Sequence, residues 1–152
     1  KYIDALAGIA VNSIGHCHPN VVKAISKQAK QLMQISNSFL SIPQALLSEK
    51  LVNITGLNRV FFANSGAEAN EAAFKLARKY AHNNGRGGTI IYMDECFHGR
   101  TLATLATGKE KYKKGFEPIP SGFIEAKYND INSVFILLFI QNVLFNCNLK
   151  KK

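Results

Sequence analysis

Residues 59–80 read RVFFANSGAEANEAAFKLARKY, and this stretch decides the fold. Its first apolar run, Val60 to Ala63, has the length and aromatic content of a buried strand and stops at the turn cluster Asn64-Ser65-Gly66. Apolar residues then recur at the i, i+3, i+4 spacing of one helical face, at Ala69, Ala72, Ala73, Leu76, Ala77 and Tyr80. The stretch therefore predicts a strand, a tight glycine turn and a helix.

The start of this helix has the features of a phosphate-binding turn. Ser65 followed by Glu68 is a capping box, in which each side chain satisfies a free backbone N–H of the first turn. The first-turn N–H groups and the helix dipole favour an anion, and Gly66 lacks the side chain that would keep a phosphate from the backbone. Ser65 as a simple helix cap explains the same residues, and no Walker A or G-x-G-x-x-G pattern is present. The local pattern alone leaves both interpretations open.

A second strand is predicted at Thr89 to Met93, which is rich in β-branched and aromatic residues. Strand, helix and strand in this order form a βαβ unit with parallel pairing. Ligands in such sheets gather at the carboxyl ends of the strands, where Ser65-Gly66 and Phe97-His98-Gly99-Arg100 would both lie. This convergence of two loops is the strongest argument for a site that the residues alone provide.

Turn residues divide the rest of the chain. Tyr2 to Val11 alternates loosely, which predicts short strands or a bent ribbon. Helices are expected to begin at Pro19 and at Pro43, and the second should end near Gly56. Later segments are predicted as a short helix at 100–107, an exposed loop at 115–122 and a strand at 123–126.

Three motifs occur in the order of one known family. They are Y-I-D-A-L-A-G-I-A-V-N-S-I-G-H-C-H-P from Tyr2, N-S-G-A-E-A-N-E-A-A from Asn64 and F-H-G-R-T from Phe97. Together they resemble the class III family of pyridoxal-phosphate aminotransferases, and within it they look most like the acetylornithine branch. The likeness runs from about Tyr2 to Asp130. It implies an α/β fold: a fragment of a fold type I large domain, with a mostly parallel sheet and flanking helices, plus part of the N-terminal small segment.

The resemblance divides the chain into three parts. Residues 1–56 would form an N-terminal segment of strands and two helices, and residues 57–133 the front part of the large domain that binds pyridoxal phosphate. Residues 134–152 form a hydrophobic tail unlike the family, as a frameshift, a misread intron or a disrupted gene would produce. The enzymes of the family are much longer, so we expect the chain to be a front portion, cut at its beginning as well.

The resemblance also implies roles for individual residues. The backbone N–H groups of Gly66 and Ala67 would bind the phosphate of the cofactor, and Ser65 would shape the turn. Phe97 would lie against the cofactor ring, and Arg100 would bind a substrate carboxylate with its planar fork. Without the resemblance, a core position for Phe97 and a solvent-facing Arg100 are equally good explanations. An arginine in the first turn of a helix lies against the dipole, and an anionic ligand would relieve that conflict.

The implied reaction moves the terminal amino group of N-acetylornithine, or of a related ω-amino acid, to 2-oxoglutarate, a step of arginine biosynthesis in the cytoplasm. The family's enzymes are homodimers with sites at the subunit boundary. Their Schiff-base lysine lies past the end of this sequence, so no catalytic residue is assigned and we expect the chain alone to be inactive. The alternative is a non-enzymatic product, truncated or a pseudoenzyme, that only associates with a partner subunit.

Composition and charge argue against other classes of function. The net charge of +9, from 19 Lys and Arg against 10 Asp and Glu, favours a solvated surface over a nucleic-acid site because no nucleic-acid motif accompanies it. Three cysteines without a C-x-x-C pattern fit a reducing cytosol. His16 and His18 lack a third ligand, so no metal is expected, and a Cys96/His98 hydrolase dyad lacks an orienting residue. The tail is too short and too often interrupted by polar residues for a membrane span.

Overall fold

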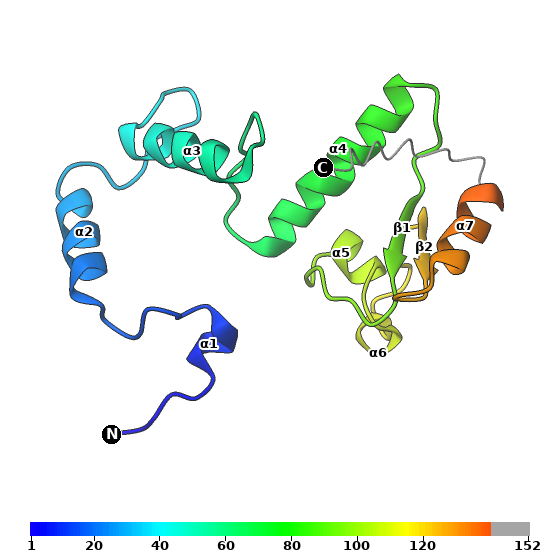
Figure 1. Cartoon of the computed structure of the whole chain (residues 1–152), viewed down its shortest axis with the longest axis horizontal. Coiled ribbons are helices and arrows are strands. Elements are labelled where there is room, and N and C mark those ends of the chain that lie inside the picture. Colours follow the sequence, from blue (N-terminus) through cyan, green and yellow to red (C-terminus); the bar gives the residue numbers. More distant parts are fainter. Residues whose placement is uncertain (141–152) are drawn as a thin grey trace. The chain divides into compact units, whose positions relative to one another are not determined.

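The computed structural model describes residues 1–140, which fall into two compact units divided between Val60 and Phe61 (Figure 1). The first unit contains α1 (Ala7–Ala10), α2 (Pro19–Ala29) and α3 (Ile42–Thr55). The second contains α4 (Gly66–Asn83), β1 (Ile90–Met93), α5 (Leu102–Ala106), α6 (Glu110–Lys113), β2 (Phe123–Ala126) and α7 (Ile131–Ile140). The architecture is α/β with a small parallel sheet, as the sequence predicts.

α2 and α3 begin close to their predicted positions, and α3 also ends where the sequence predicts. Pro19 and Pro43 lie in the first turns of α2 and α3, where the missing N–H of proline removes no helical hydrogen bond. α3 ends at Gly56, whose φ of 70° lets its N–H donate to the Val52 carbonyl at 2.9 Å. No residue of Lys1–Val60 is buried, so the apolar faces of these helices remain accessible.

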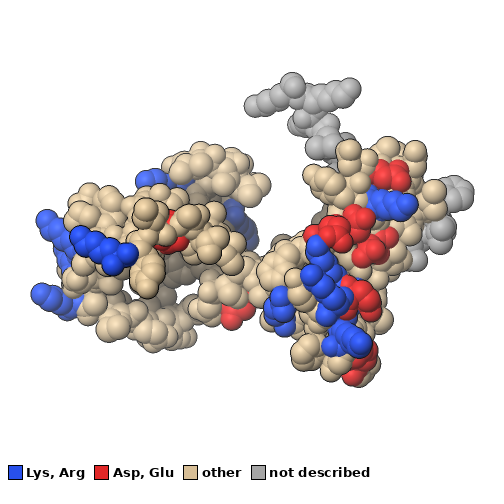
Figure 2. Space-filling model, turned by 90° about the horizontal axis from the view of Figure 1, so that it is seen from below, with Lys and Arg blue, Asp and Glu red and all other residues tan. Residues whose placement is uncertain are grey.

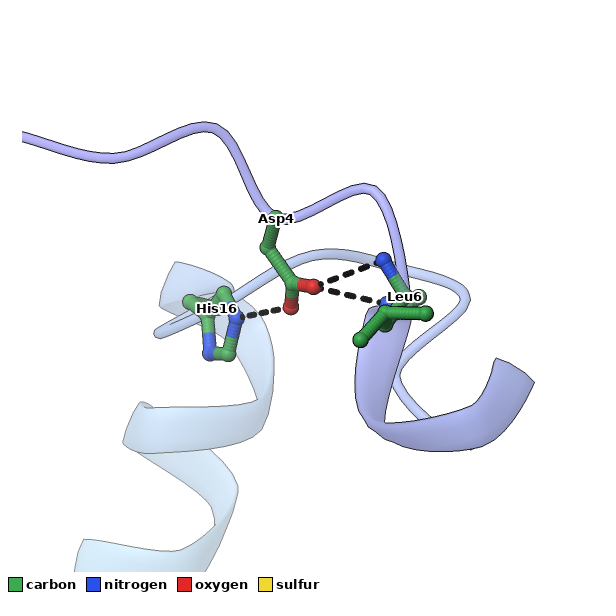
Figure 3. Close-up of polar contacts among 4 residues, drawn as sticks. Asp4, Leu6 and His16 are labelled. Atoms are coloured by element: carbon green, nitrogen blue, oxygen red, sulfur yellow. Dashed lines mark hydrogen bonds and ion pairs between the residues drawn. The ribbon is translucent and has the colours of Figure 1, made fainter.

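The first residues form a turn, and the prediction of strands at Tyr2–Val11 is wrong. All four residues of Ala7–Ala10 have a positive φ, between 48° and 63°. Asp4 holds the entry to this turn, because its Oδ1 accepts the N–H of Leu6 at 3.0 Å and that of the next residue at 2.8 Å (Figure 3). Its Oδ2 bonds to His16 Nε2 at 2.7 Å. These bonds satisfy locally the backbone groups that a strand would have offered to a neighbouring strand.

The sheet consists of β1 and β2, which pair in parallel with Ile90 opposite Phe123. The sequence predicts both strands. Its prediction of a further strand at Val60–Ala63 is wrong, because this segment joins no sheet and Phe61 is 73% exposed. A strand needs a neighbour for its N–H and C=O groups, and the described residues supply none there. The parallel crossover therefore runs from β1 through α5 and α6 to β2, and not through α4 from an earlier strand.

The core of the second unit is centred on α5. Thr104 and Thr107 are fully buried, and Leu105 and Ala106 are nearly so. Each threonine hydroxyl donates to a backbone carbonyl three residues earlier, which is why these polar side chains can be buried. The helix predicted at 100–107 is shorter than expected, because Thr101 has extended backbone angles and caps it, so that α5 begins at Leu102.

The surface of the second unit carries both signs of charge. In Figure 2, blue Lys and Arg side chains alternate with red Asp and Glu side chains over the unit that contains α6. Among the described residues of this unit, ion pairs join Lys109 to Glu95 and Lys113 to Glu110. The lysine-rich segment Lys109–Lys114 includes the single helical turn α6.

α7 contains the first part of the predicted hydrophobic tail, and residues 141–152 lie outside the described residues. Across residues 1–140, no helix combines the length and the apolar content needed to cross a bilayer.

Candidate functional site

Ser65 is the N-cap of α4, as the sequence predicts. Its Oγ accepts the N–H of Glu68 at 3.2 Å, and its backbone is extended, with φ −153° and ψ 163°. The Glu68 carboxylate accepts the N–H of Asn64 at 2.7 Å, not that of Ser65, so the returning bond of the capping box is displaced by one residue. Two hydrogen bonds therefore fix this turn, one accepted by the Ser65 hydroxyl and one by the Glu68 carboxylate.

Two backbone donors at this end of α4 remain available to a ligand. Among the residues that the structure describes, none accepts a hydrogen bond from the N–H of Gly66 or of Ala67. A Cβ built at Gly66 would meet no atom within 4 Å, so the space beside these donors is open. The helix is 18 residues long and adds the positive end of its dipole. The arrangement suits an anion such as a phosphate.

The loop that follows β1 lies against this same turn. A Cβ built at Gly99 would stand 2.6 Å from the Cβ of Ala67, so the two backbones are as close as a missing side chain allows. Asn70 Nδ2 donates to the His98 carbonyl at 2.8 Å, and the Thr101 hydroxyl donates to the Glu71 carboxylate. The structure thus brings together the two loops that the sequence places at one site.

Phe97 and Arg100 lie on this loop. Their positions contradict two interpretations of the sequence: a core position for Phe97 and a place in the first helical turn for Arg100. Phe97 is 64% exposed, which excludes a core position and leaves its ring accessible. Arg100 precedes the N-cap Thr101, so the expectation of an arginine in the first helical turn is wrong, and the dipole argument no longer applies. Its guanidinium carbon lies 4.0 Å from the ring centroid of Tyr112 and 5.6 Å from that of Phe97.

Cys96 and His98 are in contact, but their geometry does not activate a nucleophile. Cys96 Sγ lies 3.4 Å from His98 Nδ1, while the thiol donates to the Thr107 carbonyl at 2.9 Å. Burial raises the pKa of the Cys96 thiol, which disfavours the thiolate. His98 Nδ1 also lies 3.0 Å from Thr107 Oγ1, within the buried part of α5 and its flank. This cluster anchors the loop to the core.

Sequence reasoning missed three residues of this region. Asn70 and Glu71 interrupt an alanine-rich helix with polar side chains just after its first turn, and that interruption was the available signal. Tyr112 lies among lysines, and no pattern distinguished it. No three His, Cys, Asp or Glu side chains of residues 1–140 are grouped as a metal site requires, and His16 is bonded to Asp4.

Several known proteins similar to this chain are named as aminotransferases. The family model for class-III aminotransferases matches residues 1–137. The acetylornithine aminotransferase of Methanocaldococcus jannaschii is 56% identical over 137 residues, which cover 88% of this chain and 34% of the relative. That of Nitrosomonas europaea is 52% identical over 136 residues, covering 88% and 35%. The chain spans about a third of the length of these curated relatives.

Solved structures agree with this likeness. The ornithine aminotransferase of Toxoplasma gondii superposes with a TM-score of 0.83 at 29% identity, over 88% of this chain and 33% of that one. A taurine:2-oxoglutarate aminotransferase from Bifidobacterium kashiwanohense, in complex with PLP and glutamate, gives 0.75 at 29% identity, over 83% and 28%. With the family model matching nearly the whole described chain, these similarities show that the chain belongs to the class-III aminotransferase family.

Proposed function

We propose that the protein carrying this chain is a cytoplasmic, pyridoxal-phosphate-dependent aminotransferase that moves the terminal amino group of N-acetylornithine, or of a related ω-amino acid, to 2-oxoglutarate in arginine biosynthesis. Both curated relatives described above carry the acetylornithine name, which supports this amino donor. Membership of the class-III family and the PLP-bound Bifidobacterium structure imply the cofactor. The proposal concerns the whole protein, because the chain spans about a third of its relatives.

The residues present fit the cofactor at its phosphate and at its ring. Gly66 and Ala67 offer two N–H groups without a protein acceptor among the described residues, beside open space. Phe97 presents an exposed ring on the loop that contacts Ala67 through Gly99. This juxtaposition of an anion-binding helix end and an aromatic face is the observation that carries the proposal.

The proposed roles follow from these positions. When bound, the cofactor supplies an electron sink for the substrate carbon that loses a proton. Gly66 and Ala67 would donate hydrogen bonds to the phosphate, and Phe97 would cover one face of the ring. Arg100 would bind a substrate carboxylate through two parallel N–H bonds. The resemblance places the lysine that bonds the cofactor outside these 152 residues, so we propose that the chain alone does not turn over substrate.

The phosphate site can be tested by removing one donor without breaking the helix. Gly66 is the first residue of α4, where proline is well tolerated, and the extended backbone of Ser65 suits a following proline. Gly66→Pro should weaken binding of pyridoxal phosphate to the chain by roughly tenfold or more, since a charge-assisted hydrogen bond is lost. Gly66→Ala retains the N–H but adds a side chain, so the difference between Gly66→Ala and Gly66→Pro isolates the loss of the donor. Titration followed by cofactor fluorescence gives both affinities.

Two outcomes would contradict the proposal. Equal affinity of Gly66→Pro and wild type would show that the phosphate is not bound at this turn. Borohydride reduction of the chain with pyridoxal phosphate should yield no stoichiometric lysine adduct, and a specific adduct would disprove the proposed position of the lysine. Glutamate production from N-acetylornithine and 2-oxoglutarate by the chain alone would overturn the proposed inactivity.

Association with another subunit is the second proposal, and exposed apolar side chains favour it. Leu40, Ile42 and Leu46 are 96%, 76% and 60% exposed at and before α3. A surface of this kind is typical of an interface. We propose a homodimer for the whole protein; a non-enzymatic chain that only binds a partner subunit shares this surface. Light scattering on the eluting chain should show one discrete species, and polydisperse aggregate would contradict a stable module.

A further inference from the structure

We propose that Tyr112 is a positioning residue for Arg100: its ring supports the guanidinium and leaves the N–H edge free for a ligand carboxylate. The inference rests on the proposed function, since the carboxylate would be that of the amino-acid or 2-oxo-acid substrate. Neither the motifs of the sequence nor the family resemblance marks Tyr112. The contact between the two side chains assigns it.

The geometry is that of a cation over an aromatic face. The Arg100 guanidinium carbon lies 4.0 Å from the centroid of the Tyr112 ring, well within the range of a cation–π contact. Phe97 is the more distant ring, at 5.6 Å, and its 64% exposure leaves most of it accessible. Tyr112 therefore supports the guanidinium, while Phe97 remains available to the cofactor.

Tyr112 is held in place by its own element. It lies in α6, where its N–H donates to the Lys109 carbonyl at 2.9 Å, and its side chain is half-buried. Arg100 comes from the loop before α5, which is clamped to α4 by the Thr101–Glu71 bond. The stacked pair thus joins two separately anchored segments, which restricts the rotamers of a long side chain before any ligand arrives.

The charge of Arg100 is not neutralised by the protein around it. Among the described side chains no carboxylate lies within ion-pair distance of its guanidinium. The acidic groups near it in the sequence have other partners: Glu95 pairs with Lys109, and Glu110 pairs with Lys113 at 3.4 Å. A guanidinium donates only in its own plane, so a ring stacked on its face would block no donor and would leave free the edge whose two N–H groups match a carboxylate.

Carboxylate binding by the full 152-residue chain tests the proposal. Titrating 2-oxoglutarate while following the Arg100 Nε–H signal by NMR should give similar affinities, within about twofold, for wild type and Tyr112→Phe, which retains the ring. Tyr112→Leu should bind about fivefold more weakly, the loss expected for one cation–π support. Inorganic phosphate, the probe for the α4 end, should bind all three proteins equally.

Two controls separate positioning from general effects. Lys111 also lies over the Tyr112 ring, with its Nζ 5.1 Å from the centroid, so Lys111→Gln tests whether nearby positive charge alone explains the binding. Its affinity for 2-oxoglutarate should equal that of wild type, and a loss as large as that of Tyr112→Leu would overturn the proposal. A parallel loss of phosphate binding in Tyr112→Leu would do the same, since it would indicate damage to the fold.

The remaining outcomes distinguish this inference from the proposed function. If Arg100→Gln loses 2-oxoglutarate while Tyr112→Leu binds normally, the role of Tyr112 is disproved and the proposed function stands. If Arg100→Gln binds as wild type does, or wild type does not bind at all, the carboxylate site and this inference both fail. A measurement on wild type needs no variant: the Arg100 Cδ protons should show an upfield ring-current shift that persists in Tyr112→Phe, and its absence overturns the stacking.

Discussion

Gly99 and Ala67 pack so closely that a side chain at residue 99 would stand 2.6 Å from the Cβ and 3.0 Å from the Cα of Ala67. The contact joins the loop after β1 to the first turn of α4, and the bond from the Asn70 amide to the His98 carbonyl reinforces it. The N–H groups of Gly66 and Ala67 and the loop that carries Phe97 therefore share one fixed geometry. A change at this contact should affect stability and ligand binding together.

Gly99→Ala is the direct test of that contact. The new methyl group would also stand 2.8 Å from Thr104 Oγ1, and the φ of 139° is one that side chains rarely adopt. We expect the free energy of unfolding to fall by roughly 1–3 kcal/mol, and phosphate binding to weaken with it. Urea unfolding followed by circular dichroism gives the first quantity.

The control for this variant is Gly87→Ala. A Cβ at Gly87 meets no atom within 4 Å, and its φ lies outside the left-handed range. Its free energy of unfolding should therefore stay within about 0.5 kcal/mol of wild type. Coincident unfolding curves for Gly99→Ala and Gly87→Ala would show that the loop is not packed against α4 as described.

The cap of α4 should contribute measurably to stability. Ser65→Ala removes the oxygen that accepts the Glu68 N–H, so the free energy of unfolding should fall by about 1 kcal/mol, and Ser65→Thr should recover most of it. Ser48→Ala is the contrasting variant, because the Ser48 hydroxyl only donates to the Gln44 carbonyl within α3 and caps nothing. Equal effects of Ser65→Ala and Ser48→Ala on thermal unfolding would contradict the role of Ser65.

Local sequence signals predicted the elements that depend on local interactions. The helix at Gly66–Asn83 and the strands at Ile90–Met93 and Phe123–Ala126 follow from spacing, capping and residue type. Val60–Ala63 has the same strand-like composition, but whether it pairs depends on neighbours that lie elsewhere in space. The prediction of strands at Tyr2–Val11 was wrong for a related reason: the Asp4 side chain accepts backbone N–H groups that a strand would have offered to a neighbouring strand.

The site was predictable in part. Gly66 and the loop at Phe97 were expected at one place because strands of a parallel sheet share a carboxyl edge, and the two do meet although the first strand is absent. The placement of Arg100 in a helix was wrong because Thr101 caps α5 after it. Tyr112 could not be found from the sequence, since its contact with Arg100 depends on how two separate segments pack.

The two described cysteines should differ in reactivity. Cys17 is exposed, whereas Cys96 is half-buried, donates to the Thr107 carbonyl, and has a pKa raised by burial. Since the thiolate is the reactive form, Cys96 needs a higher pH than an ordinary thiol before it reacts. Iodoacetamide at neutral pH, with peptide mapping over time, should label Cys17 well before Cys96. Faster labelling of Cys96 would contradict this expectation and would support the Cys96/His98 hydrolase dyad.

The bond between Asp4 and His16 should make the N-terminal turn sensitive to acid. The hydrogen bond from His16 lowers the pKa of Asp4 below its ordinary 3.8, and the N–H groups of the turn lower it further. Because the folded pKa lies below the unfolded one, the stabilisation is present above about pH 4 and is lost as the pH falls through the folded value. NMR titration of the Asp4 carboxyl carbon follows this directly.

His16→Asn should move the pKa of Asp4 back towards its ordinary value, because the largest of the three lowering contacts is removed. His82→Asn is the matched control: His82, in the last turn of α4, is not among the groups that lower the pKa of Asp4 and should leave the Asp4 titration unchanged. Asp4→Asn retains an oxygen for the two N–H bonds but carries no charge, so the chemical shifts of Leu6 should no longer move with acid. An Asp4 titration that is identical in wild type and His16→Asn would contradict the role of His16. It would show that only the N–H groups of Leu6 and Ala7 lower the pKa of Asp4.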